Sequence, residues 1–351
     1  MTPASPWWDQ SRHADRRPFL QARGRIKSAL RDWFNTQGFT EIEAGQLQIS
    51  PGNETHLHGL GTQVLTPDGR SQTRYLHTSP EFSCKKLLAA GETQIYDFAR
   101  VFRNREAGPL HATEFTMLEW YRARNDWNVV IADTLTILQV AAAAVPTQHF
   151  SRKGHHVALN RSPSRLNVCA AFADMAKIDL LATLTPNGDG DTCLLREAAL
   201  SAGFKISHDD TWSDIFSKIL VEKIEPHLGM ESPTILCEYP ACEAALARRS
   251  PTDGRLSERF ELYVCGVELA NGFGELTDPI EQRARFEADM ALKHAIYGHS
   301  YPIDEDFLTA LAYMPPASGV AMGFDRLVML ATGAMRIDDV IWTPQTVSNQ
   351  T

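Results

Sequence analysis

The sequence lacks several features that define whole classes of protein. Its six cysteines are scattered, and none forms a pair at the spacing of a zinc site. No apolar run approaches the length of a membrane span, and no apolar core follows the first charges as in a signal peptide. Repeats, low-complexity tracts and extended charge runs are also missing. We therefore expect a cytoplasmic globular protein with reduced thiols and no membrane contact.

The sequence also lacks an excess of basic residues. Its 34 Lys and Arg stand against 43 Asp and Glu, which gives a formal net charge of -9 over 351 residues. Proteins that cover a long stretch of nucleic-acid backbone usually carry a basic excess. A large nucleic-acid footprint is therefore disfavoured, although a local basic patch is compatible with this balance. With 43% hydrophobic and 22% charged residues, the chain has the composition of a soluble globular protein.

Two alternating segments suggest a hairpin that carries charged groups. Ile95 to Phe102 and Phe115 to Tyr121 are rich in aromatic and β-branched residues, and Gly108-Pro109 between them suits a turn. Arg103 would then lie at the loop mouth, while Glu119 and Tyr121 would share one face of a strand. This layout can hold a phosphate-bearing group beside an amine. Taken alone, the stretch fits an ordinary hairpin with a surface arginine equally well.

Two later segments add a second arginine and two carboxylates. The run from Glu261 to Leu269 is strand-like, and the sequence from Glu268 to Asp278 reads ELANGFGELTD. From Ser318 to Leu330, a strand of small residues meets a helix that begins near Asp325-Arg326. Gly319 and Gly323 would allow close approach of the backbone to a ligand. Arg326 at a helix start could meet a polyphosphate that faces the helix N-terminus.

These segments together resemble motifs 2 and 3 of the class II aminoacyl-tRNA synthetases, and most closely the lysyl branch. The resemblance runs from about Gly24 to Gly333. It implies an α+β fold, a class II catalytic core with an antiparallel sheet flanked by helices. We expect a single domain over 1–351, with a helical insertion at about 151–259 where the motif pattern is lost.

The resemblance also implies a homodimer, because Arg25 to Glu43 reads as the helix and strand of motif 1, the dimer element of the superfamily. The proline that the family carries after this strand is absent, since Glu43 is followed by Ala44-Gly45. That departure bears on the dimer geometry more than on the chemistry.

The same resemblance implies amino-acid activation with ATP and Mg²⁺. Arg103 matches the arginine that holds the α-phosphate and the substrate carboxylate, and Arg326 matches the one that meets the terminal phosphate. Glu268 and Glu275 match the acidic positions that bind magnesium, with surface ion pairs as the alternative. The ATP site implied in this way comprises Arg103, Asn104, Arg105, Glu268, Leu269, Gly323 and Arg326.

An amino-acid site is implied by Ser79, Pro80 and Glu81, which match a family segment that contacts this substrate. Glu81, Tyr121 and Glu275 could surround an ammonium group, which favours lysine or a related amino acid over an apolar one. Glu81 also suits the start of a helix over Phe82 to Leu88.

Ala321 stands where lysyl-tRNA synthetases usually carry glycine and where the elongation factor P–(R)-β-lysine ligases carry alanine. One added methyl group can favour a shifted amino group by about 1–3 kcal/mol. The alternative is that alanine is only a tolerated small residue.

Two departures from the family concern adenine. Arg105 stands where the family has a glutamate, with Glu106 next, and Ala112 replaces an asparagine of the family. Adenine recognition by this loop would then fall to Glu106 or to backbone groups.

The N-terminal region shows no alternating strands that could form the anticodon-binding barrel of lysyl-tRNA synthetases. The chain thus looks similar to the elongation factor P–(R)-β-lysine ligases, which activate (R)-β-lysine and transfer it to a lysine of elongation factor P. This predicts elongation factor P as partner and argues against tRNA as the acceptor. The alternatives are a minimal lysyl-tRNA synthetase, a non-catalytic amino-acid sensor, and a metal hydrolase using Glu268 and Glu275.

Overall fold

The computed structural model describes residues 6–345, so both ends of the predicted domain 1–351 lie outside the described part. Its centre is an eight-stranded sheet in the order β1-β5-β6-β13-β12-β11-β10-β9. These strands are β1 (Thr40–Glu41), β5 (Gln94–Phe102), β6 (Glu114–Ala123), β9 (Ser164–Asn167), β10 (Thr234–Cys237), β11 (Arg259–Val264), β12 (Val267–Gly274) and β13 (Ala317–Gly323). Smaller sheets contain β2 (Leu47–Gln48), β3 (Leu60–Leu65) and β4 (Ser71–Leu76), and β7 (His149–Arg152) with β8 (His155–Ala158).

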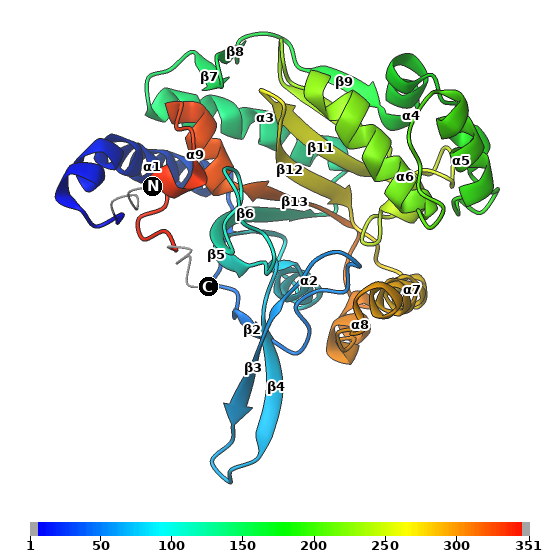
Figure 1. Cartoon of the computed structure of the whole chain (residues 1–351). Coiled ribbons are helices and arrows are strands. Elements are labelled where there is room, and N and C mark those ends of the chain that lie inside the picture. The colour runs from blue at the N-terminus through cyan, green and yellow to red at the C-terminus, as the bar shows by residue number, and fades with distance from the viewer. Residues whose placement is uncertain (1–5, 346–351) are drawn as a thin grey trace.

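Most neighbouring strands of the central sheet are antiparallel, as the sequence predicted. The exceptions are the two outer pairs, β1 with β5 and β10 with β9, which are parallel. The predicted hairpin forms between β5 and β6, where Phe102 pairs with Glu114. In the turn, Gly108 and His111 form a β-bridge, so the turn predicted at Gly108-Pro109 is confirmed. The hairpin of β3 and β4 projects from the body of the molecule (Figure 1).

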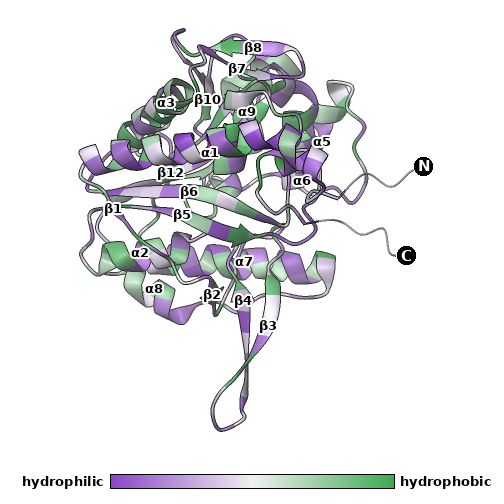
Figure 2. Cartoon of the chain, turned by 90° about the vertical axis from the view of Figure 1, so that its left-hand side faces the viewer, coloured by the Kyte–Doolittle hydropathy of each residue, from purple (hydrophilic) through white to green (hydrophobic). Residues whose placement is uncertain are grey.

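Helices cover both faces of the central sheet, so the predicted α+β class is confirmed. Helices α1, α3 and α9 lie on one side, and α2, α7 and α8 lie on the other (Figure 2). Their bounds are α1 (Gln10–Thr36), α2 (Glu81–Ala89), α3 (Trp127–Ala144), α7 (Pro279–Tyr297), α8 (Glu305–Leu311) and α9 (Phe324–Thr332). Each side has its own apolar core: Phe34, Trp120 and Leu327 are buried on the first, and Phe82, Phe286 and Phe307 on the second.

Helix α1 is longer than the sequence predicted, since it begins at Gln10 instead of Arg25. Asp9 caps its start by accepting hydrogen bonds from the backbone N–H groups of Ser11 and Arg12. Two buried arginines fasten the helix to the C-terminal part of the chain. Arg16 donates to the carbonyl of Ile341, and Arg23 pairs with Asp325 at the start of α9.

Helix α3 is long and apolar enough to cross a membrane by length and composition, contrary to the sequence prediction. It nevertheless packs against the central sheet and α1, and half of the helix is buried inside the protein. Its Asp133 forms an ion pair of 2.7 Å with Arg122 of β6. These contacts are those of a core helix, because they bind an apolar face and a buried carboxylate to the sheet.

The run from Glu261 to Leu269 is a hairpin and not the single strand that the sequence predicted. The chain reverses between β11 and β12, where Cys265 has φ 53° and Gly266 has φ 66°. Two successive residues with positive φ are typical of the tight turns that fit the twist of a hairpin. The apolar alternation continues through this turn, so it concealed the reversal. The fold consequently brings Glu261 and Glu268 onto neighbouring strands.

The segment 151–259, which the sequence predicted as a helical insertion, contains helices and also two strands of the central sheet. Its helices are α4 (Val168–Ala171), α5 (Thr192–Ser201) and α6 (Trp212–Ile219), with two π-helical turns, Phe172–Ala176 and Leu220–Ile224. They enclose a separate core that includes Phe172, Trp212 and Phe216. Strands β9 and β10 of the same segment extend the central sheet. The extent of the predicted insertion remains a prediction.

Candidate active site

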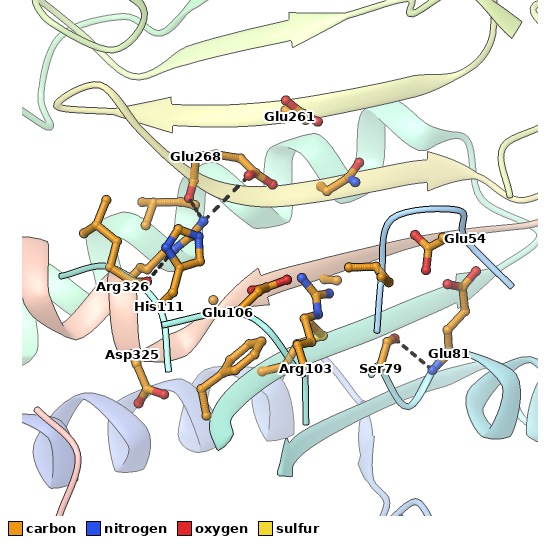
Figure 3. A pocket seen from close by; sticks show the side chains of 18 of the residues that line it. Glu54, Ser79, Glu81, Arg103, Glu106, His111, Glu261, Glu268, Asp325 and Arg326 are labelled. Atoms are coloured by element: carbon orange, nitrogen blue, oxygen red, sulfur yellow. Dashed lines mark hydrogen bonds and ion pairs between the residues drawn. The ribbon is translucent and has the colours of Figure 1, made fainter. Parts of the chain in front are cut away.

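A cavity of about 370 Å³ lies over strands β6, β12 and β13, next to the start of α9 (Figure 3). Eight of the predicted site residues line it: Ser79, Glu81, Arg103, Glu268, Leu269, Ala321, Gly323 and Arg326. The five that do not are Pro80, Asn104, Arg105, Tyr121 and Glu275. Arg326 and Glu268 mark one end of the cavity, and Glu81 marks the other (Figure 3).

Arg326 is held by backbone and imidazole acceptors at the start of α9. Its guanidinium donates to the carbonyl of Glu268 at 2.8 Å and to Nε2 of His111 at 2.7 Å. Burial, and next the charge of Arg326, lower the pKa of His111, so the imidazole is neutral and its Nε2 can accept. The preceding Asp325 also lines the cavity, and its carboxylate pairs with Arg23. Arg326 thus contacts Glu268 and His111 beside the cavity, whereas its neighbour Asp325 contacts helix α1.

Arg103 lies at the mouth of the β5–β6 hairpin, as predicted. Its backbone N–H donates to the carbonyl of Thr113 at 2.9 Å, which continues the ladder beyond the strands. Its Nε lies 3.3 Å from the carbonyl of Thr78, and its guanidinium lies 5.5 Å from the centre of the Phe115 ring. No carboxylate of the described residues forms an ion pair with it. Its remaining N–H groups are therefore available to an anion in the cavity.

Two carboxylates, Glu261 and Glu268, line the cavity from the paired strands β11 and β12. Glu261 is buried and accepts hydrogen bonds from the hydroxyls of Tyr239 and Tyr263 at 2.6 and 2.7 Å. The side chain of Glu268 is 42% exposed. Burial, and next the charge of Glu261, raise the pKa of Glu268. Two close carboxylates of this kind suit Mg²⁺, which takes oxygen ligands.

Glu275, by contrast, lies away from Glu268. The two are seven positions apart in extended chain, which corresponds to roughly 20 Å along a strand. Glu275 does not line the cavity, and its carboxylate pairs with Lys85. The structure thus favours Glu261 with Glu268 as the metal-binding pair, in place of Glu268 with Glu275. The described residues contain no group of three or more His, Cys, Asp or Glu that could hold a metal ion.

The opposite end of the cavity is rich in buried carboxylates. Glu119 of β6 accepts hydrogen bonds from Ser79 Oγ at 2.7 Å and from the hydroxyl of Tyr121. Burial, and next the charge of Glu81, raise the pKa of Glu119 to about 8, so it is largely protonated at neutral pH. Burial likewise keeps the pKa of Tyr121 far above its usual range, so its hydroxyl remains a donor.

Lys85 of α2 joins two of the predicted substrate-binding carboxylates. Its Nζ lies 2.6 Å from Glu81 and 2.6 Å from Glu275, and its side chain is completely buried. Burial alone would lower the pKa of Lys85, but the two carboxylates outweigh it and the pKa is raised. The protein thus supplies one ammonium of its own among these glutamates. A substrate ammonium would have to find the acceptors that remain.

Ala321 and Gly319 of β13 shape this end of the cavity. Ala321 pairs with Glu119 in the sheet and lines the cavity, whereas Gly319 pairs with Tyr121. A Cβ at position 319 would lie about 2.3 Å from the Tyr121 ring and 2.5 Å from Glu275 Oε1. A side chain there would therefore displace both, and only glycine fits this contact. A methyl group at position 321, by contrast, reaches into the cavity.

The rest of the predicted ATP loop points elsewhere. Asn104 donates its backbone N–H to the carbonyl of His58, and Arg105 adopts φ 63° and lies over the Tyr297 ring at 5.4 Å. Glu106 and His111 line the cavity in their place. Sequence reasoning had suggested Glu106 as a substitute for the missing adenine contact. Its position in the cavity agrees with that suggestion.

Comparison with known proteins gives independent evidence on the family of this chain. The family model of class II tRNA synthetases of the D, K and N type matches residues 4–347. The chain belongs to this family.

Several curated relatives of this class II chain carry one name, elongation factor P–(R)-β-lysine ligase. The protein of Proteus mirabilis is 39% identical over 93% of this chain and 94% of its own length. That of Haemophilus influenzae is 37% identical over 92% and 93%, and that of Salmonella arizonae is 39% identical over 92% and 94%. The predicted resemblance is thereby confirmed.

Sequence reasoning missed three charged residues in or next to the cavity. Glu261 was hidden because its strand and the next were read as one. Lys85 was overlooked because a lysine in an amphipathic helix usually lies at the surface. Glu54, in the loop before β3, lines the cavity but belongs to no segment with a recognisable pattern. Among these three, only Glu261 had a signal in the sequence, because Cys265-Gly266 could have indicated a turn between two strands.

Proposed function

We propose that this protein activates (R)-β-lysine with ATP and transfers the β-lysyl group to a lysine side chain of elongation factor P. The observation that carries this proposal is the identity of 36–39% to ligases of that name over more than nine-tenths of the chain. The geometry supports it, because a cavity with arginines at its centre and at one end has carboxylates at the other. Such a cavity suits a polyphosphate next to a cationic amino acid.

In the activation step, the amino-acid carboxylate attacks the α-phosphate of ATP and pyrophosphate leaves. The protein must align the two anions and neutralise the charge that develops. Arg103 lies between the two ends of the cavity, so its free N–H groups serve the substrate carboxylate and the α-phosphate. Arg326 serves the terminal phosphate from the start of α9. Phe115 offers a flat face to adenine, and Glu106 offers an acceptor for its amino group.

Magnesium would be held by Glu261 and Glu268. Their carboxylate oxygens fit the preference of this ion, and the hydrogen bonds of Tyr239 and Tyr263 fix the orientation of Glu261. When bound, the ion would supply positive charge that neutralises phosphate oxygens. Burial, and next the charge of Glu261, raise the pKa of Glu268, so a bound cation would favour its ionised form.

The amino-acid end would select a lysine-like substrate. Glu119 can ionise to accept an ammonium group, and Glu81 and Glu275 retain oxygens beyond those that face Lys85. The Ala321 methyl group lies beside Glu119 and narrows the space in which an amino group next to the carboxylate would sit. A β-amino group is displaced by one carbon and avoids this methyl group.

A direct test combines two measurements on the purified protein. Pyrophosphate exchange into ATP is measured with (R)-β-lysine and with α-lysine in the presence of Mg²⁺. Transfer is then followed as a mass increase of elongation factor P, beside acid-precipitable charging of tRNA in the same mixture. We expect exchange with (R)-β-lysine and modification of elongation factor P. Absence of exchange with either isomer would favour a non-catalytic amino-acid sensor, and efficient tRNA charging would favour a minimal lysyl-tRNA synthetase.

We further propose a homodimer, in which α1 and β1 occupy the place of motif 1. Leu47 and Ile49, which follow β1 closely, are exposed apolar side chains in the single chain and would gain cover in a dimer. Sedimentation at micromolar concentration should give a species of twice the chain mass. A monomer under these conditions would contradict the proposal.

A further inference from the structure

Transfer to a lysine side chain needs a proton acceptor, because the incoming amine is protonated at neutral pH and only the free amine is nucleophilic. The carboxylates around the cavity differ in their readiness for this task. Glu81 and Glu275 face Lys85, and Glu119 already accepts two hydrogen bonds. Glu261 accepts two tyrosine hydroxyls and pairs with Arg259. These four are engaged by the protein itself.

Glu54 differs from them. It lines the cavity at the end occupied by Glu81 (Figure 3), and it is half-buried. No hydrogen bond or ion pair to its carboxylate occurs among residues 6–345. Its charged neighbours are Arg103, Glu81, Asp289 and Arg259, with Lys293 behind the loop. Glu54 is therefore a carboxylate near the reacting centre that the fold leaves free.

The loop that carries Glu54 is nevertheless firmly positioned. The buried ammonium of Lys293 on α7 donates to the carbonyls of Thr55 and Leu57 at 2.8 and 2.6 Å. Thr55 Oγ1 donates to Asp289, one helical turn earlier on α7, at 2.6 Å. The backbone N–H of Gly59 donates to the Tyr301 hydroxyl at 2.9 Å. The position of Glu54 is thus fixed by its backbone, while its carboxylate remains available.

We propose that Glu54 is the general base of the transfer step, an inference that rests on the proposed function. Its carboxylate takes one proton from the ammonium group of the acceptor lysine. The free amine attacks the carbonyl carbon of the β-lysyl adenylate and forms the C–N bond. The C–O bond to the phosphate breaks, AMP leaves with that electron pair, and the second N–H proton passes to the departing phosphate. Arg103, next to Glu54, holds the acyl-phosphate group during the attack.

The electrostatic setting of Glu54 agrees with this role. Burial raises the pKa of Glu54 to about 7, which Arg103 opposes and Glu81 and Asp289 reinforce. A base is most effective when its pKa lies near the working pH. Because the base acts as the carboxylate, transfer should increase as the pH rises through about 7 and be lost below it.

The test separates transfer from activation in single-turnover reactions with preformed adenylate. In Glu54→Gln, transfer to elongation factor P should fall by about 100-fold or more, the usual scale for a lost general base. The adenylate is trapped in parallel with hydroxylamine, a nucleophile that is already neutral at pH 7 and needs no base. Trapping should be affected far less than transfer. Glu54→Asp should restore part of the rate, and the exposed Glu92→Gln serves as the matched control.

The pH profile provides a readout that a structural role would not change. Wild-type transfer should level off above about pH 7, whereas in Glu54→Gln it should keep rising with the free-amine fraction of the acceptor. An equal loss of transfer and trapping would overturn the inference, since Glu54 would then act in binding or activation. Transfer by Glu54→Gln at the wild-type rate would overturn the inference as well. If the wild type formed hydroxamate but never modified elongation factor P, the proposed acceptor would fail and this inference with it.

Discussion

The two ends of the cavity hold their charged groups in different ways. At the phosphate end, Arg326 is bound by the carbonyl of Glu268 and by neutral His111, and Glu268 itself is partly open to water. At the amino-acid end, Lys85, Glu275 and Glu119 are almost completely buried and contact other side chains. Charges at the first end await a ligand, whereas Lys85, Glu275 and Glu119 at the second end already have partners within the protein. Substitutions should therefore cost activity at one end and stability at the other.

The largest expected effect is the removal of the buried ammonium in Lys85→Met. Glu81 and Glu275 would lose their shared partner, and leaving buried charge uncompensated typically costs about 3–5 kcal/mol of the free energy of unfolding. Chemical denaturation measures this change, with the exposed Lys223→Met as control. The double variant Lys85→Met with Glu275→Gln removes both charges of one pair and should recover part of the loss. Unchanged stability of Lys85→Met would erase the contrast between the two ends.

The next effect concerns activity instead of stability. Arg103→Ala should lower adenylate formation by about 10²–10³-fold, because a charge contact to the transition state is lost. Its stability should stay near that of the wild type, since the only side-chain hydrogen bond of Arg103 within the described chain is the long one to Thr78. Pyrophosphate exchange and denaturation are measured on the same preparation, with Arg74→Ala on the exposed hairpin as control. If Arg103→Ala exchanged pyrophosphate at the wild-type rate, Arg103 would have no role in adenylate formation.

A smaller effect is expected from Ala321→Gly, which alters shape at the amino-acid end without altering charge. Loss of the methyl group should shift preference toward α-lysine by about 1–3 kcal/mol, or roughly 10- to 200-fold in the ratio of kcat/KM. The ratio is measured by pyrophosphate exchange with each isomer. Ala317→Gly, at the far end of the same strand and outside the cavity lining, is the control. An unchanged isomer ratio would leave Ala321 without a role in specificity.

The sequence predicted the two arginines of the cavity better than the side-chain pairs that the fold brings together, for a physical reason. Arg103 and Arg326 lie where a strand or turn gives way to the next element, and such positions are visible in the pattern of apolar residues. Lys85 and Glu275 meet only because α2 and the end of β12 pack together in three dimensions. Glu261 and Glu268 meet because of a turn that the apolar alternation concealed. Long-range pairing of this kind leaves no local signal in a single sequence.

The smallest expected effect is a pH dependence that belongs to the buried end alone. Because the pKa of Glu119 is raised to about 8, this carboxyl is mostly neutral at pH 7 and mostly ionised at pH 9. An ammonium binds more tightly to the ionised form, so the KM for (R)-β-lysine should fall as the pH rises through about 8, by at most about tenfold per pH unit. Pyrophosphate exchange measures this slope.

Glu119→Gln keeps an acceptor for the Tyr121 hydroxyl but cannot ionise. It should raise the KM for (R)-β-lysine and flatten its dependence on pH across this range. Glu114→Gln lies on the same strand but outside the cavity lining, and it should keep the wild-type slope. A slope that survives in Glu119→Gln would assign the titration to another group. The buried end would then bind its cation through Glu81 and Glu275 alone, with Glu119 serving only to hold Ser79 and Tyr121 in place.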